Sequence, residues 1–266
     1  ESTIYLLYNT SEKRYMVKKY ILIFICIIPM WAAAQVGEHR NQFTVGIQGG
    51  CNLNTVSFLP KVNQKMAVGT TGGLTVRYTS EKYFKTICSV QMEFNYSQLG
   101  WEEEILDGND NPVPVLNGTD NEHFKRTINY FQIPVLAHLA WGKEKKGVNF
   151  FFEAGPQIGF HISDKIEANF NHTNINYEGR GLNIEKDKDR FEQHYAKLES
   201  PFDNKFDYGI AAGGGLEVHI KSIGRFQLTG RYYYGLGNLF NDSKKDYFSR
   251  SPHQTITVRA AYLLDL

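Results

Sequence analysis

Residues 87–97 decide the fold, and they read Ile-Cys-Ser-Val-Gln-Met-Glu-Phe-Asn-Tyr-Ser. From Cys88 to Tyr96 every second side chain is apolar or aromatic, and the positions between them hold serine, glutamine, glutamate and asparagine. Successive side chains of a β-strand point to opposite faces, so this alternation predicts a strand with one apolar and one polar face. The stretch is long enough for a tilted strand to cross a bilayer, which takes about 9–11 residues.

Seven further stretches show the same alternation, so the sequence predicts eight strands. The other seven are residues 43–54, 68–78, 127–140, 148–161, 206–220, 226–235 and 254–264. Their polar faces are crowded with glycine and charged residues, which would line the ligand cavity of a soluble barrel poorly. Their apolar faces become aromatic near the strand ends, as contact with lipid and its interfaces requires. We therefore predict an all-β fold, an eight-stranded antiparallel up-and-down transmembrane β-barrel.

The connections between these predicted strands alternate in length. The first, third, fifth and seventh are each longer than every one of the second, fourth and sixth. Outer-membrane barrels have short periplasmic turns and long external loops, whereas a soluble barrel has no reason to separate connections in this way. The alternation predicts that both chain ends lie in the periplasm, and it places the protein in the cell outer membrane.

Residues 16–34 have the order of a secretion signal: lysines near the start, an apolar run at 21–28 and three alanines at 32–34. The apolar run is too short to span a bilayer as a helix. We expect residues 16–34 to be a signal peptide and residues 1–15 to be an upstream segment outside the mature protein. Residues 35–266 are then the outer-membrane β-barrel domain.

The composition limits the kinds of partner. The 29 basic and 28 acidic residues nearly balance, which argues against nucleic acid. Cys51 and Cys88 fall at opposite ends of their predicted strands, so we expect two free thiols facing lipid rather than a disulfide. The expected partners are outer-membrane lipid and, through the external loops, other envelope or secretion proteins.

Several short motifs resemble the PorT-like outer-membrane β-barrel family of Gram-negative bacteria. They are residues 43–54, 91–100, 130–136, 152–159, 212–217 and 231–237. Each is weak alone, and their order and spacing together are specific. The resemblance implies an eight-stranded barrel in the outer membrane and implies little about activity. Its eponymous member is an accessory of the type IX secretion system, a role that the resemblance does not carry over to this chain.

Charged side chains on the polar faces are the candidate functional residues. By parity six of them point into the lumen: Arg77, Glu93, Glu153, Glu217, Arg231 and Arg259. An isolated ion there is costly, so we expect these acids and bases to pair and to plug the narrow interior. We expect Glu217 to pair with Arg231 or Arg259, since they lie on neighbouring strands at similar depth. The functional alternative is an ion path or a gate in which the pairs rearrange.

Neither a metal site nor a catalytic group emerges from the histidines. His138, His161 and His219 face the predicted lumen, but strand direction puts His161 at the opposite end, and a metal ion needs all its ligands within about 2 Å. The external loops hold four more: His123, His172, His194 and His253. No Ser/His/acid or Asp/His spacing stands out among them. We therefore predict no catalytic residue, no metal and no cofactor, with an outer-rim hydrolase, omptin-like or deacylase-like, as an alternative.

The long connections are the predicted functional surface, because loops on a rigid scaffold carry binding. Residues 107–112 look like a fragment of a calcium loop but lack EF-hand spacing, so we interpret them as a polar turn. Residues 184–200 are compatible with a helix inside a charged, solvated flap. The function we expect is that of a non-enzymatic barrel: an envelope scaffold, a binding protein or a secretion-system accessory. A small-solute or ion pore is the alternative from a different class.

Overall fold

The computed structural model describes residues 37–116, 118–143, 147–170, 174–220, 223–241 and 247–266. The predicted signal peptide and the segment before it lie outside these described residues. The elements are β1 (Glu38–Val56), β2 (Gln64–Lys65), β3 (Ala67–Tyr83), β4 (Thr86–Glu103), β5 (Phe124–Gly142), β6 (Gly147–Ala168), α2 (Ile184–Glu199), β7 (Phe206–Ile220), β8 (Gly224–Gly235) and β9 (His253–Asp265). No helix within these ranges is both long and apolar enough to span a membrane.

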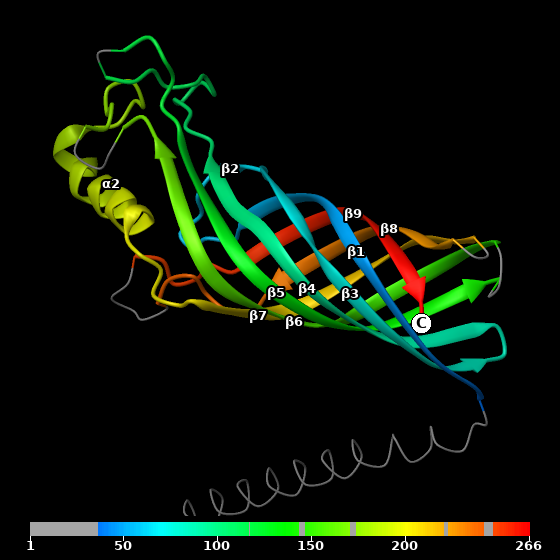
Figure 1. Ribbon diagram of the computed structural model, residues 1–266. Coiled ribbons are helices and arrows are strands. Elements are labelled where there is room, and N and C mark those ends of the chain that lie inside the picture. Colours follow the sequence, from blue (N-terminus) through cyan, green and yellow to red (C-terminus); the bar gives the residue numbers. More distant parts are fainter. Residues whose placement is uncertain (1–36, 117, 144–146, 171–173, 221–222, 242–246) are drawn as a thin grey trace, which may run out of the picture.

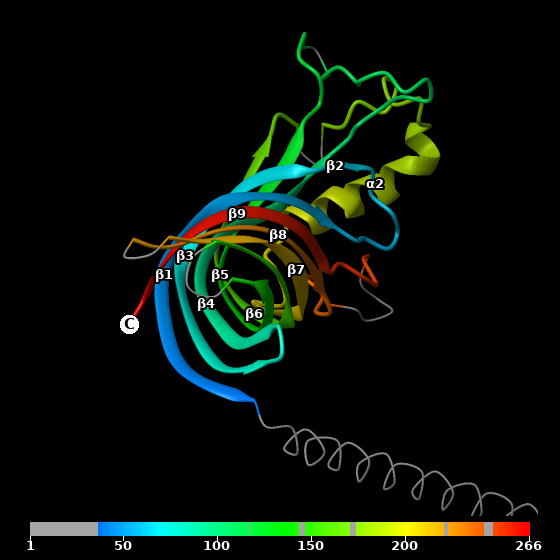
Figure 2. The ribbon, with the colours of Figure 1, turned by 90° about the vertical axis from the view of Figure 1, so that its right-hand side faces the viewer.

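Eight of the strands close into a ring (Figure 1 and Figure 2). β1 pairs with β3, each strand from β3 to β8 pairs antiparallel with the next, and β9 returns to pair with β1. The short β2 adds to the external end of β4 and stands outside the ring. Closure leaves the ring no free edge, which an open sheet of this size would expose. The predicted eight-stranded up-and-down barrel is confirmed.

All eight predicted strands lie within observed ones, and β4, β5 and β6 extend beyond them at the loop end. This extension has an opposite-charge ladder on its outer face, where Lys125 lies across from Glu102 on one neighbour and Glu167 on the other. Cross-strand pairs of this kind stabilise a sheet. The sequence pattern missed the extension because its outer face is polar and therefore has no apolar period.

The connections confirm the predicted alternation. Short connections span residues 84–85, 143–146 and 221–223, and long ones span residues 57–66, 104–123, 169–205 and 236–252. All the long connections lie at one end of the barrel, where α2 also lies (Figure 1). This end faces the outside of the cell if both chain ends are periplasmic.

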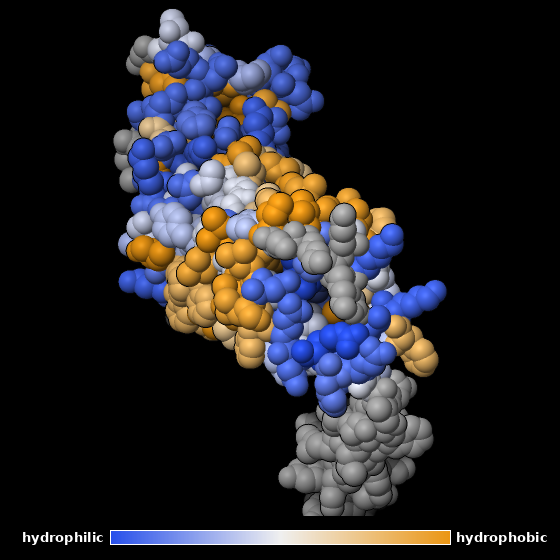
Figure 3. Space-filling model, turned by 45° about the vertical axis from the view of Figure 1, so that its right-hand side comes forward, coloured by the Kyte–Doolittle hydropathy of each residue, from blue (hydrophilic) through white to orange (hydrophobic). Residues whose placement is uncertain are grey.

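On the face that Figure 3 shows, apolar side chains form a band across the middle of the barrel, between polar ends. Ile47, Val68 and Phe150 on the outer face of the barrel are all more than 60% exposed. Exposed apolar surface on this scale is rare on a soluble monomer and is what lipid contact requires. Cys51 and Cys88 are free and belong to the same outer face.

The external loops and α2 pack over the barrel mouth as a folded cap. Its apolar core is a cluster of buried side chains drawn from every long loop and from the strand ends: Val56, Phe58, Val62, Leu99, Trp101, Ile105, Val113, Phe124, Ile128, Tyr130, Phe170, Ile175, Tyr177, Tyr195, Leu198, Phe202, Leu239, Phe240 and Phe248. The helix predicted near residues 184–200 is confirmed as α2, which begins after the N-cap Asn183. The solvated flap is wrong, because Tyr195 and Leu198 of α2 are fully buried in this core.

Candidate functional site

Four of the six predicted lumen charges meet in one ring of ion pairs. Arg231 donates from Nη1 and Nη2 to the two Glu93 oxygens at 2.9 and 2.8 Å, and from Nε to Glu153 Oε1 at 2.8 Å. Arg259 pairs with Glu93 and donates to Glu153 Oε1 at 3.1 Å. Because all four side chains are buried, two acids and two bases neutralise each other away from water.

The other two predicted charges, Arg77 and Glu217, lie nearer the short turns. Glu217 accepts from Arg77 Nη1 at 2.5 Å and from Arg225 Nη1 at 3.2 Å, and Arg225 Nε donates to Asp265 at 2.8 Å. Gln91 joins this group to the ring above, since it accepts from Arg77 Nε at 2.9 Å and donates to Glu93 at 2.6 Å. The lumen therefore holds one continuous polar network.

The expected pairing of Glu217 with Arg231 or Arg259 is wrong. Glu217 lies across from Gln227, whereas Arg231 lies across from Gly213. This separation of four residues is roughly 13 Å along the strand, and both Arg231 and Arg259 pair with Glu93 and Glu153 instead. Arg225, the real partner on β8, was missed because the predicted strand began one residue later. Its parity with Arg231 was the signal that could have found it.

Little space remains beside this network. A polar cavity of about 20 Å³ lies next to it, lined in part by Gln48, Asn95 and Arg259. A water molecule needs about 10–15 Å³ of such volume, so the cavity is too small for a solute larger than water. The arrangement resembles a plug more closely than a path.

The cap is fastened to the barrel by Arg126 of β5. Its guanidinium donates to the Leu198 and Ser200 carbonyls at 2.5 and 2.8 Å and to Asp164 at 2.6 Å. The same group lies 3.8 Å from the centre of the Phe202 ring. A buried cation that binds carbonyls at the end of α2 holds that helix over the mouth.

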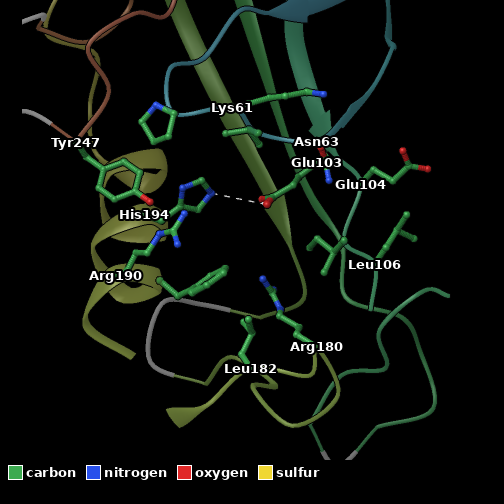
Figure 4. A pocket seen from close by; sticks show the side chains of 14 residues that line it. Lys61, Asn63, Glu103, Glu104, Leu106, Arg180, Leu182, Arg190, His194 and Tyr247 are labelled. Atoms are coloured by element: carbon green, nitrogen blue, oxygen red, sulfur yellow. Dashed lines mark ion pairs between the residues drawn. The ribbon is translucent and has the colours of Figure 1, made fainter. Parts of the chain in front are cut away.

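A second polar chain crosses the cap and lines a cavity of about 230 Å³ (Figure 4). Arg180 donates to Glu122 and to the Tyr195 hydroxyl, both at 2.8 Å, and that hydroxyl donates to Glu103 Oε1 at 3.0 Å. His194 Nε2 lies 3.7 Å from the same Glu103 oxygen. Burial and the neighbouring Glu103 carboxylate raise the pKa of the Tyr195 phenol well above its ordinary value, so the phenol stays a hydrogen-bond donor.

Residues 107–112, interpreted as a polar turn, form one. The Asp107 carboxylate accepts from the backbone N–H groups of Asn109 and Asn111 at 2.7 and 2.9 Å. These hydrogen bonds, that of Asn111 first, lower the pKa of Asp107. The carboxylate thus closes its own loop, as aspartate does in many turns.

Family comparison decides what kind of protein carries this network and this cap. Residues 33–241 match the model of the family described as outer membrane protein beta-barrel domain. The chain belongs to this family. Its protein is therefore an outer-membrane β-barrel protein, and the apolar band of Figure 3 is its lipid-facing surface.

Solved outer-membrane barrels are similar to this family member at low sequence identity. Neisserial surface protein A has 10% identity and a TM-score of 0.37, over 83% of this chain and 96% of that one. Ail of Yersinia pestis, in complex with the heparin analogue sucrose octasulfate, has 14% identity and a TM-score of 0.34, over 84% of this chain and 99% of that one. OprG from Pseudomonas aeruginosa has 9% identity and a TM-score of 0.37, over 86% of this chain and 99% of that one. No curated protein matches the sequence.

The histidines of this outer membrane protein beta-barrel domain are distributed among separate contacts. His138 is buried against Phe151, His219 lies 3.6 Å from Asp265, and His161 lies 3.2 Å from Asp164. Within the described ranges, no three His, Cys, Asp or Glu side chains are grouped closely enough to hold a metal ion. His194 and Glu103 do face one another, yet none of the described residues that line their cavity is Ser, Thr or Cys.

Proposed function

We propose that this outer-membrane protein is a closed, non-enzymatic binding platform: the barrel anchors the cap, and the cap binds molecules outside the cell. The observation that carries the proposal is the filled lumen. Seven buried or nearly buried charged groups pair across it: Arg77, Glu93, Glu153, Glu217, Arg225, Arg231 and Arg259. A solute would have to separate these pairs, and leaving a buried ion without its partner is costly.

The cap supports the same function. It places a second obstacle in series with the lumen, because its core includes Ile128 and Tyr130 on the lumen side of β5. A pore has no need of such a core, whereas a binding surface needs loops held in one shape. Arg126 and the Arg180 chain both hold α2 in place, which keeps the outer surface rigid.

Planar-bilayer recording of the purified barrel tests the proposal. We expect a silent membrane from the native protein. The double variant Glu93→Gln, Arg231→Gln removes one acid and one base from the ring and shortens one of its side chains, and it serves as a matched control for incorporation and leakage. Stable conductance steps from the native protein would show that it is a pore and would contradict the binding platform.

An accessory role in envelope secretion is the more specific form of this proposal. It is supported by the cap, which is folded rather than solvated and therefore offers a partner protein a surface of fixed shape. Cross-linking in native membranes, through a cysteine introduced at the exposed Asp189 of α2, tests it. Recovery of one recurrent envelope protein is the expected result, and a cysteine placed at periplasmic Lys85 is the control.

A further inference from the structure

The cavity of about 230 Å³ lies where all four external loops meet. Its lining includes Lys61 and Asn63 from the first long connection, Glu104 from the second, Arg190 from the third and Tyr247 from the fourth. Its volume approaches the roughly 300 Å³ at which small-ligand pockets begin. A site assembled from every loop of a cap is a specific place rather than a surface irregularity.

The carboxylate of Glu103, one of the lining residues, has an oxygen without a partner in the described part of the chain. Glu103 Oε1 accepts from the Tyr195 hydroxyl, but the second oxygen, Oε2, is buried and makes no hydrogen bond to the described residues. Buried acceptors are normally paired, because an unpaired one loses its hydration without replacement. A ligand that donates a hydrogen bond to Oε2 would restore the missing contact.

The surrounding charges favour a neutral donor over a cation. Arg180 donates to the Tyr195 hydroxyl, which in turn donates to Glu103. His194 Nε2 lies 3.7 Å from the same carboxylate. A further cation would meet these basic groups, whereas a hydroxyl group fills the open position without adding charge.

The rim of the cavity favours an anionic group. Lys61 and Arg190 are exposed there, and neither makes an ion pair with any described residue. Glu104, the other acid of the lining, has Lys65 at 3.9 Å. An excess of unpaired bases attracts an anionic group to the opening.

Aromatic side chains complete the cavity. Phe191 and Tyr247 contribute aromatic rings to the lining. Asn63, which Figure 4 labels together with Tyr247, contributes an amide that both donates and accepts hydrogen bonds. A compact ring with hydroxyl groups matches this mixture of flat apolar walls and polar groups. These features are those of a single sugar ring, and the basic rim selects a sugar that carries an acid.

We propose that the cap cavity binds an acidic sugar, a hexuronic acid unit, with a hydroxyl group on Glu103 and its carboxylate at Arg190. The inference rests on the proposed function, because it requires that the cap binds molecules at the outer surface. The shared chemistry could be presented by a glycan outside the cell or by an acidic sugar of the membrane's own lipopolysaccharide.

Calorimetric titration of sodium glucuronate into the full-length barrel in detergent tests the site. Glucuronate should bind at least about tenfold more tightly than glucose, the effect of one charge-assisted hydrogen bond. Glu103→Gln puts an amide donor in place of an acceptor and should weaken both sugars, whereas Arg190→Gln should weaken glucuronate alone. Glu102→Gln, one residue away and outside the cavity, is the matched control. Heat-modifiable gel mobility verifies that the barrel of every variant is folded, and resistance to trypsin verifies that its cap is folded.

Equal binding of both sugars, no binding at millimolar concentration, or unchanged binding by Glu103→Gln would each overturn the proposal. Competition by a soluble polyuronate would identify an external glycan as the source, and competition by lipopolysaccharide micelles would identify the membrane. A silent bilayer without glucuronate binding would contradict the acidic-sugar site and leave the proposed binding platform standing. Conductance by the native protein would contradict the binding platform, whatever the titration shows.

Discussion

Inside the barrel, charged side chains from the strands pair with one another, whereas above the barrel, loops pack aromatic rings around a few polar groups. The lumen network draws on strand positions two residues apart, such as Gln91 and Glu93, so its geometry is set by the strand ladder. The cap core brings together Trp101, Tyr195 and Phe248, which no local pattern connects. The difference teaches that one molecule can close the same opening twice, by charge pairing where strands dictate positions and by apolar burial where loops are free to fold.

The largest effect is expected in the lumen. Glu93→Ala leaves Arg231 and Arg259 with one acid between them, and the loss of a buried partner should cost about 3–5 kcal/mol of unfolding free energy. Urea unfolding in detergent, followed by heat-modifiable gel mobility, measures it. Val218→Ala, on the lipid-facing side of β7, is the control and should cost far less. Equal small losses would mean that the lumen is wet, and the comparison with the cap would fail.

The next effect should be local to the cap. Leu198→Ala empties a fully buried position of the apolar core, which typically costs about 2–4 kcal/mol. Trypsin cleavage at the basic residues of α2 should accelerate by about 30-fold or more, since local opening exposes them. The gel mobility of the barrel should not change. Loss of the folded gel mobility together with the trypsin resistance of α2 would show that cap and barrel unfold as one unit.

The identity of the partners is tested by charge exchange. Glu217→Arg destabilises the barrel, and Arg77→Glu added to it should restore about 0.5–3 kcal/mol, because these two side chains are in direct contact. Arg231→Glu added to the same variant should restore nothing. Rescue by Arg231→Glu instead would mean that Glu217 lies opposite Arg231, which contradicts the strand register described above.

The smallest effect concerns Tyr195, and it depends on pH. Its pKa is raised in the folded cap, so the stability it contributes is fully present below the unfolded pKa of about 10 and is lost as pH rises beyond it. Tyr195→Phe removes two hydrogen bonds at a cost of about 1–2 kcal/mol. Proteolysis of the cap should accelerate in native protein above pH 10, and the variant should lose that dependence. A native cap insensitive to alkali would contradict the buried phenol.

Sequence reasoning reached the strand side of this comparison and little of the cap. Period-two alternation predicted all eight strands and the inward direction of Glu93 and Arg231, because a strand's geometry repeats within a few residues. It misplaced Glu217, since depth in a barrel depends on register, which the turns set and parity does not reveal. Tyr195 and Glu103 could not be brought together from sequence, because their contact depends on how two separate loops fold.

Closure of the ring by β1 and β9 also sets the order in which the protein can assemble. Thr44 pairs with Asp265, so the last contact of the barrel joins segments from the two ends of the folded chain. Contacts of such high sequence separation form slowly, and meanwhile the lipid-facing side chains are exposed to water. The unclosed chain is therefore more prone to aggregation than the closed barrel, because it exposes free strand edges and lipid-facing side chains at the same time.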